Sequence, residues 1–153
     1  MNKLFDLKLA ELFENIGRQK KMVLSTVCEN HVTSRMMSVI IMDGCFYFQT
    51  DKIFRKYEQI KKNPQVALCM DNIQIEGSCM ELGHPLENKE FCEFYRQAFQ
   101  NSYDKYTAME NERLFKIVPN FIQKWIYEDG EPYIENFDFE RQQYLKVIYQ
   151  YDR

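Results

Sequence analysis

The feature that most constrains this chain is a series of short β-prone runs separated by tight turns. β-Branched and aromatic residues concentrate in these runs, and polar pairs separate them. Asp43-Gly44 is typical of a two-residue hairpin, so the first three runs predict an antiparallel meander. The runs are 22–28, 32–41, 45–50, 65–70 and 73–82.

Amphipathic stretches predict helices around these strands. Residues 4–19 and 88–100 place apolar side chains at helical spacing. Residues 52–62 form a third candidate, which Asp51 can cap and Asn63-Pro64 stops. We therefore expect three helices in the first two thirds of the chain.

The C-terminal third adds further strands and a helix. Residues 114–118 and 121–127 are predicted to be strands, and 139–151 a helix, whereas the polar stretch 101–113 predicts no element. Closing a sheet removes its exposed edges. Together, the predicted strands and helices indicate a β-rich α+β fold, namely a six-stranded antiparallel split β-barrel with peripheral helices.

Composition restricts the class of protein. The chain has 153 residues, of which 45% are apolar and 28% charged, so we expect one globular domain over 1–153 and neither disorder nor a membrane protein. Charges interrupt any signal-peptide core at the N-terminus, which predicts a cytoplasmic protein. A net charge of −3 argues against nucleic acid as a partner. Five cysteines without a Cys-x-x-Cys pair favour reduced thiols in strands over disulfides or a metal site.

A basic cluster stands out in this acidic chain. Residues 52–62 contain five basic side chains and one acidic one, a pattern that usually marks a solvated helix face. Lys52, Arg55 and Lys56, however, fall in the first turns of the predicted helix, where free N–H groups favour an anion. Thr50 precedes them with a hydroxyl donor, so together they predict a phosphate pocket.

A further cation, Arg35, lies within a predicted strand. Taken alone, it is typical of an exposed position on the polar face of the strand. In the predicted meander its strand pairs with the strand that ends at Thr50, so Arg35 can approach the same pocket. The guanidinium fork matches the geometry of a phosphate group.

These motifs resemble the FMN-binding core of the pyridoxamine 5'-phosphate oxidase-like proteins in residue type and spacing. The matching segments are Arg35-Met36-Met37-Ser38-Val39-Ile40, Phe46-Tyr47-Phe48-Gln49-Thr50-Asp51, Arg55-Lys56 and Asn63-Pro64-Gln65-Val66-Ala67-Leu68. The run Ile73-Gln74-Ile75-Glu76-Gly77 is similar to the segment that follows in that family. The resemblance covers residues 20–82 well and the remainder loosely.

The resemblance implies FMN held between the two subunits of a homodimer. Four residues would hold the FMN phosphate: Arg35, Thr50, Arg55 and Lys56. Main-chain groups of four more would line the flavin: Met36, Met37, Ser38 and Val39. Gln49 would sit beside the flavin, and Asn72 stands where the oxidases have a glutamine that reaches the partner's flavin.

Departures from the family argue against vitamin B6 oxidation. The oxidases grip their substrate with a late Arg-x-His motif, and neither His31 nor His84 stands in one. The C-terminal part looks more like small relatives that include the nitroimidazole-resistance proteins. That branch implies flavin-dependent reduction of a small nitroaromatic or quinone, with NAD(P)H as a candidate electron donor. Trp125 and Tyr127 could stack near the flavin, although alternating strand aromatics are more often core.

Three classes of function stay open. The sequence offers no nucleophile–base pair, so in an FMN-dependent oxidoreductase the flavin would supply the chemistry. A protein that only binds or stores flavin or haem fits the same motifs. An interaction domain whose basic helix contacts an acidic partner is the third class, and it predicts a colourless protein.

Overall fold

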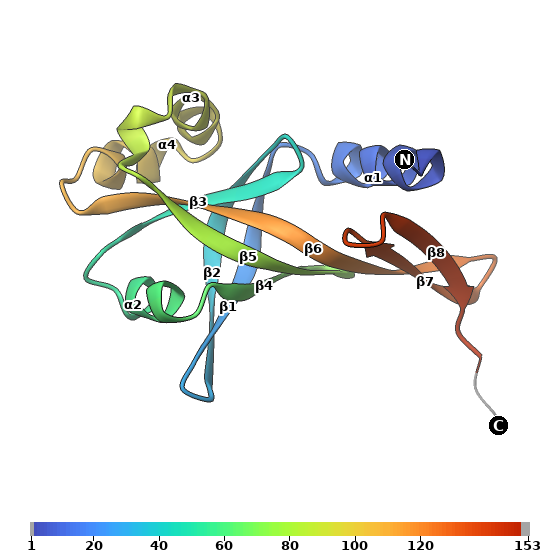
Figure 1. Ribbon diagram of the computed structural model, residues 1–153. Helices are drawn as coiled ribbons and strands as arrows, with labels where there is room; N and C mark the ends of the chain where they lie inside the picture. The colour runs from blue at the N-terminus through green and yellow to red at the C-terminus, as the bar shows by residue number, and fades with distance from the viewer. Residues whose placement is uncertain (1, 151–153) are drawn as a thin grey trace.

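The computed structural model describes residues 2–150, and its framework is a set of antiparallel strands. Their bounds are β1 Gln19–Cys28, β2 His31–Met42, β3 Cys45–Asp51, β4 Gln65–Met70, β5 Ile73–Gly83, β6 Glu112–Glu128, β7 Glu131–Asp138 and β8 Gln143–Ile148. They are hydrogen-bonded in the order β3-β2-β1-β4-β5-β6-β7-β8, and β3 also pairs with β6. This additional pairing closes six strands into a barrel and leaves β7 and β8 as an extension (Figure 1). The predicted six-stranded split barrel is confirmed, and β7 and β8 add a hairpin that the sequence analysis did not predict.

The meander of β1, β2 and β3 forms as predicted. Asp43 and Gly44 both have positive φ, 50° and 73°, as a twisted two-residue hairpin requires. Glu29 and Asn30 make the preceding turn with φ of 51° and 66° and no glycine. Both turns fix the register of their strands, so each strand presents alternate residues to the barrel interior.

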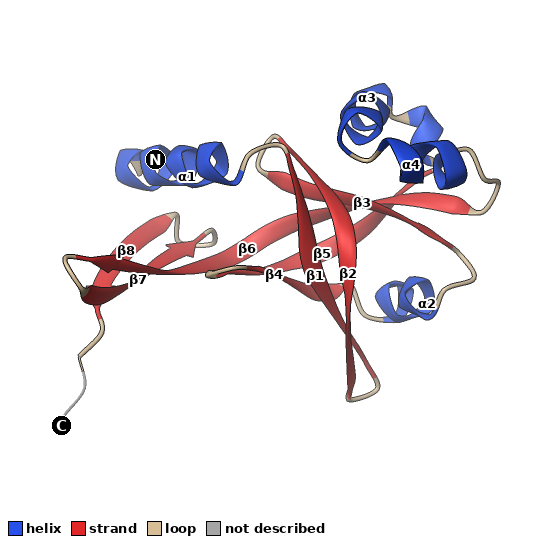
Figure 2. Ribbon diagram, turned by 180° about the vertical axis from the view of Figure 1, so that it is seen from behind, coloured by secondary structure: helices blue, strands red, loops and turns tan. Residues whose placement is uncertain are grey.

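Helices lie around the barrel rather than within it. Their bounds are α1 Lys3–Ile16, α2 Arg55–Lys62, η1 Pro85–Glu87, α3 Lys89–Ala98, α4 Gln100–Ser102 and η2 Tyr103–Thr107. Figures 1 and 2 show α1 beside β7 and β8, and α2 on the other side of the barrel from α3 and α4. The segment between β5 and β6, residues 84–111, is called the β5–β6 insert below. It carries every helical turn from η1 to η2, so helical turns extend to Thr107 in the stretch 101–113 for which the sequence predicted no element, and β6 begins within that stretch at Glu112.

The start of α2 differs from the prediction. The helix begins at Arg55, so Lys52 lies outside it. Asp51 does not cap the helix, because its carboxylate accepts a hydrogen bond from the backbone N–H of Ile53 at 2.9 Å and holds a turn before the helix. The residue at the N-cap position is Phe54, which forms no side-chain cap.

The C-terminal part differs more. The two strands predicted on either side of Pro119 are one strand, β6, because a register shift opposite Gly77 absorbs the position where proline has no N–H to donate. The helix predicted for 139–151 is wrong within the described residues: β8 occupies that stretch and pairs with β7 along its length. Residue 151 lies outside the described part.

Two hydrophobic clusters hold the fold together. The larger fills the barrel and includes the stacked rings of Phe48 and Phe115, whose centroids are 5.3 Å apart. The smaller lies on the outer face of β2, β3 and β6 beneath α3, where Tyr47 packs with Phe91 and Tyr95. Since α3 belongs to the β5–β6 insert, this second cluster fixes the insert against the barrel.

The cysteine thiols are free within residues 2–150, and Cys92 lies on α3 rather than in a strand. Burial raises the pKa of Cys79 to about 12, which is typical of an inert thiol. Among the described residues, no helix has the length and apolar character needed to cross a membrane.

Candidate functional site

Three cations meet where α2 packs on the barrel. Arg35 comes from β2, and Arg55 and Lys56 open α2. Burial, and then the charge of Arg55, lower the pKa of Arg35, while burial, and then the charge of Arg35, lower the pKa of Lys56. No carboxylate in the described part of the chain lies within 4 Å of these cations as an ion-pair partner. We call Arg35, Arg55 and Lys56 the cation cluster; Arg35 repels both of the others, and the charge of Glu112 opposes this effect at Lys56.

Arg35 is fixed by hydrogen bonds rather than left free in solvent. It donates to the backbone oxygen of Leu24 at 3.2 Å and to the hydroxyls of Thr26 and Thr33 at 2.9 and 2.6 Å. It also donates to Gln59 Oε1 of α2 at 3.2 Å. Gln59 accepts from the two threonine hydroxyls as well, so one amide oxygen links β1, β2 and α2.

The route by which Arg35 reaches this site differs from the predicted one. β2 pairs with β3 only from Ile40 to Met42, far along the strand from Arg35. Strand pairing therefore does not carry Arg35 to Thr50. The contact instead runs through α2, because Gln59 lies one helical turn beyond Arg55 and Lys56.

Thr50 lies at the end of β3 beside this cluster and is buried without a partner. Its side chain is 3% exposed, and its Oγ1 has no hydrogen-bond partner among residues 2–150. An unsatisfied buried hydroxyl costs about 1–3 kcal/mol, so it calls for a partner that the chain itself does not provide. Thr50 and Lys56 together line a cavity of about 460 Å³, here called the α2 pocket, whose far wall is formed by Tyr95 and Tyr106 of the β5–β6 insert.

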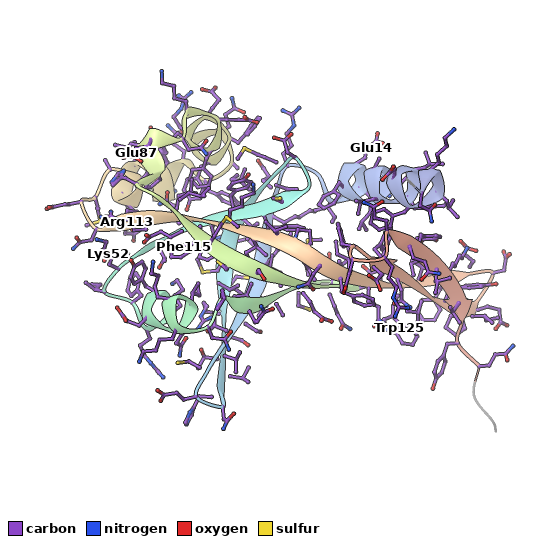
Figure 3. All side chains as sticks on the ribbon, in the orientation of Figure 1. Glu14, Lys52, Glu87, Arg113, Phe115 and Trp125 are labelled. Atoms are coloured by element: carbon purple, nitrogen blue, oxygen red, sulfur yellow. The ribbon has the colours of Figure 1, made fainter. Side chains whose placement is uncertain are left out.

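The start of α2 leaves its first-turn amides without a side-chain cap. Lys56 Nζ lies 4.7 Å from the centroid of the Phe54 ring, the side chain at the N-cap position of this helix. In Figure 3, Lys52 lies with Arg113 at this end of the molecule, while Trp125 lies toward the opposite end.

Glu112 is the pocket residue that the sequence analysis missed. It is 5% exposed and is the cross-strand partner of Asp51 where β3 pairs with β6. Gln49 hydrogen-bonds its carboxylate, and Thr107 Oγ1 donates to Gln49 Oε1 at 2.9 Å. Burial, and then Asp51, raise the pKa of Glu112 to about 7, against the opposing effects of Lys56 and Gln49. Glu112 follows a polar stretch without periodicity, so no local pattern indicates its burial.

The β2 segment predicted to line a flavin alternates between the two faces of the strand. Met37 and Val39 pack into the barrel core. Met36 is 61% exposed on the other face, where Ser38 is hydrogen-bonded to Tyr95 of the insert. The role predicted for these residues uses main-chain groups and therefore does not depend on where the side chains point.

Four further residues considered in the sequence analysis lie away from the cation cluster: Asn72, Trp125, Tyr127 and His84. Asn72 occupies the turn between β4 and β5, where its amide donates to the backbone oxygen of Trp125. The Trp125 ring packs on Tyr149, and Tyr127 is 72% exposed near the end of β6. His84 Nδ1 accepts from the backbone N–H of the residue two positions later, and its Nε2 lies 2.8 Å from the carbonyl oxygen of Met109, so it joins the two ends of the insert.

Comparison with known proteins gives a match in fold. No family model matches the chain, and no curated protein matches its sequence. PhzG from Burkholderia lata 383, solved with tetrahydrophenazine-1-carboxylic acid, is 13% identical with a TM-score of 0.65, and the match covers 99% of this chain and 98% of PhzG. A pyridoxamine 5'-phosphate oxidase-related, FMN binding protein from Nostoc punctiforme is 11% identical with a TM-score of 0.59, covering 97% and 94%.

A third match is HutZ, the heme storage protein from Vibrio cholerae, at 14% identity with a TM-score of 0.57, covering 75% of this chain and 89% of HutZ. The fold is therefore the split barrel of the pyridoxamine 5'-phosphate oxidase-like proteins.

The hydroxyl of Thr50 gives a test of the site in the ligand-free protein. Thr50→Val keeps the shape of the side chain and removes an unpaired polar group, so the free energy of unfolding should stay unchanged or rise by up to about 1 kcal/mol. Thr26→Val is the matched control, equally buried but hydrogen-bonded to Gln59 and Arg35; it should lower the free energy of unfolding by about 1–3 kcal/mol. Urea denaturation measures both. Equal losses for the two variants would show that the Thr50 hydroxyl has a partner within the protein.

Proposed function

We propose that this protein binds FMN, with the phosphate of the flavin held by the cation cluster and Thr50. The observation that carries the proposal is that Arg35, which repels both Arg55 and Lys56, lies at the same end of the barrel as a buried hydroxyl that has no partner among the described residues. A phosphate monoester carries about −1.5 to −2 charges and three acceptor oxygens, which match this set of donors. The residues present thus fit the phosphate of the flavin.

The donors have different roles in this proposal. Four hydrogen bonds already engage both terminal nitrogens of Arg35, so Arg35 contributes mainly its charge. Lys56 and Thr50 both line the α2 pocket and can donate directly to phosphate oxygens. Arg55 lines a separate hollow with Gln59 rather than the α2 pocket, so in this proposal it adds positive charge beside the site. The uncapped amides at the start of α2 supply further donors.

The flavin ring is proposed to lie against the main chain of β2 from Met36 to Val39, at the seam of a homodimer. The outer face of β1, β2 and β4 supports this arrangement. Strand register places eight small or apolar side chains side by side on that face: Val23, Ser25, Val27, Val32, Ser34, Met36, Ala67 and Cys69. Lys21 of β1 lies on the same face, opposite Ser38, and borders this uncharged patch. In a chain with 28% charged residues, such a surface is typical of a contact with a second copy. Asn72 would then contact the partner's flavin.

The reaction proposed is flavin-dependent reduction of a small nitroaromatic or quinone. Bound FMN would supply the transfer of reducing equivalents, and the protein would supply binding, orientation and exclusion of water. The chain's own residues fix the phosphate end and leave the ring face at the subunit seam for substrate. The electron donor would be NADH or NADPH, bound transiently.

Removal of either α2 cation should weaken FMN binding. Arg55→Ala and Lys56→Ala should each cost about 1–3 kcal/mol of binding free energy, the range for charge-assisted hydrogen bonds, measured by quenching of flavin fluorescence. Lys62→Ala, at the exposed far end of the same helix, is the matched control and should bind FMN like the wild type. A double variant of Arg55 and Lys56 that titrates like the wild type would count against the site.

The dimer seam can be tested independently. Met36→Lys adds a charge to the uncharged patch, so it should shift the protein toward monomer in sedimentation velocity and weaken FMN binding. Tyr127→Lys changes an equally exposed apolar side chain elsewhere and should leave the dimer intact. A wild-type protein that sediments as a monomer would remove the second wall of the proposed flavin site.

Storage of flavin or haem is the second candidate, because HutZ, named as a heme storage protein, has the same fold. The visible spectrum of the purified protein separates flavin from haem. For an oxidoreductase, excess NADH or NADPH without oxygen should bleach the yellow flavin band. A yellow protein that neither reagent bleaches would favour storage.

A further inference from the structure

Two carboxylates stand where the proposed phosphate would enter. Asp51 and Glu112 are direct partners across the pairing of β3 with β6, and both line the α2 pocket together with Thr50 and Lys56. Like charges directly opposite each other destabilise a sheet. Next to a site for an anion they would also repel the ligand, so this pair needs a physical explanation.

Glu112 is the member of the pair that the fold holds in place. Glu112 is buried, and its carboxyl group is hydrogen-bonded to Gln49. Gln49 in turn accepts a hydrogen bond from Thr107 of the insert. The groups that face it are Asp51 and Gln49 from β3, Lys56 from α2 and Tyr95 from α3. Lys56 is the cation among them, and it is also a proposed ligand of the phosphate.

We propose that Glu112 takes up a proton when a phosphate ester enters the α2 pocket, so that ligand binding is coupled to protonation and weakens as pH rises. This inference rests on the proposed function of the pocket. The proton comes from solvent and ends on the Glu112 carboxylate; no bond to the ligand is made or broken.

The coupling follows from charge. An incoming phosphate adds negative charge beside Glu112. It also pairs with Lys56, the cation that otherwise favours the carboxylate form of Glu112. Both effects favour the neutral acid. A protonated carboxyl also has an O–H that can donate to a phosphate oxygen, whereas a carboxylate can only repel it.

The direction with pH can be worked out from the ligand-free protein, in which burial and Asp51 raise the pKa of Glu112 to about 7. Below this pH the group already carries its proton and the ligand meets a neutral side chain. Above it, each binding event must take up a proton, so the association constant falls by up to about tenfold per pH unit until the pKa of the bound state is reached.

The test compares wild type with Glu112→Gln, a neutral side chain of the same shape. FMN dissociation constants of both proteins are measured from about pH 6 to about pH 8.5. The dissociation constant of the wild type divided by that of the variant, here called the quotient, does not depend on the titration of the FMN phosphate itself. The quotient should be near one at the acidic end and rise about tenfold or more toward the alkaline end. Glu110→Gln, at an exposed position in the insert, is the matched control and should give a pH profile like that of wild type.

A second measurement uses the wild-type protein alone. Calorimetric titration with FMN near pH 8, in buffers of different ionisation enthalpy, should show uptake of up to about one proton per FMN bound. If FMN binds tightly but the quotient stays constant with pH, or no proton is taken up, the proposed coupling is wrong and the proposed FMN site is unaffected. Absence of FMN binding at every pH, in wild type and variant alike, would instead overturn the proposed function.

Discussion

The pairing of β3 with β6 is the interaction on which the rest of this structure depends. It closes the six-stranded barrel, and it also determines which segments surround the α2 pocket. α2 follows β3 after a short turn, and the β5–β6 insert leads directly into β6. Joining the two strands therefore brings the start of the basic helix and the tyrosines of the insert to opposite walls of one cavity.

That end of the barrel combines several features that a stable fold would otherwise avoid. Arg35 repels two neighbouring cations, a buried hydroxyl has no partner among residues 2–150, a helix starts without a side-chain cap, and two carboxylates are direct partners across paired strands. Local violations of this kind are expected at functional sites, where a ligand supplies what the chain does not. Arg35 shows how the fold sustains them, because its hydrogen bonds to three elements hold a half-buried charge in place.

Local patterns in the sequence predict the elements well where one period dominates. The meander, β4, β5 and the amphipathic helices α1 and α3 follow from alternation, turn residues and helical spacing. The helix predicted for the C-terminal stretch was wrong because the spacing of Tyr144 and Ile148 suits a helix as well as a strand. The stretch forms a strand because it pairs with the free edge of β7, a long-range contact that no local pattern indicates. Glu112 was missed because its burial arises from long-range pairing with β3. The sequence analysis expected Arg35 to lie near the start of α2. It did not identify Gln59, whose side chain links Arg35 to α2, because no local pattern marks this glutamine.

The most direct test of the account is a crystal structure of the protein grown with FMN. The account predicts one phosphoryl group at each α2 pocket, with oxygens within hydrogen-bond distance of Thr50 Oγ1 and Lys56 Nζ. It also predicts the flavin ring at the boundary between two copies of the chain. An FMN phosphate located away from Thr50 and Lys56, with these side chains unchanged, would contradict it.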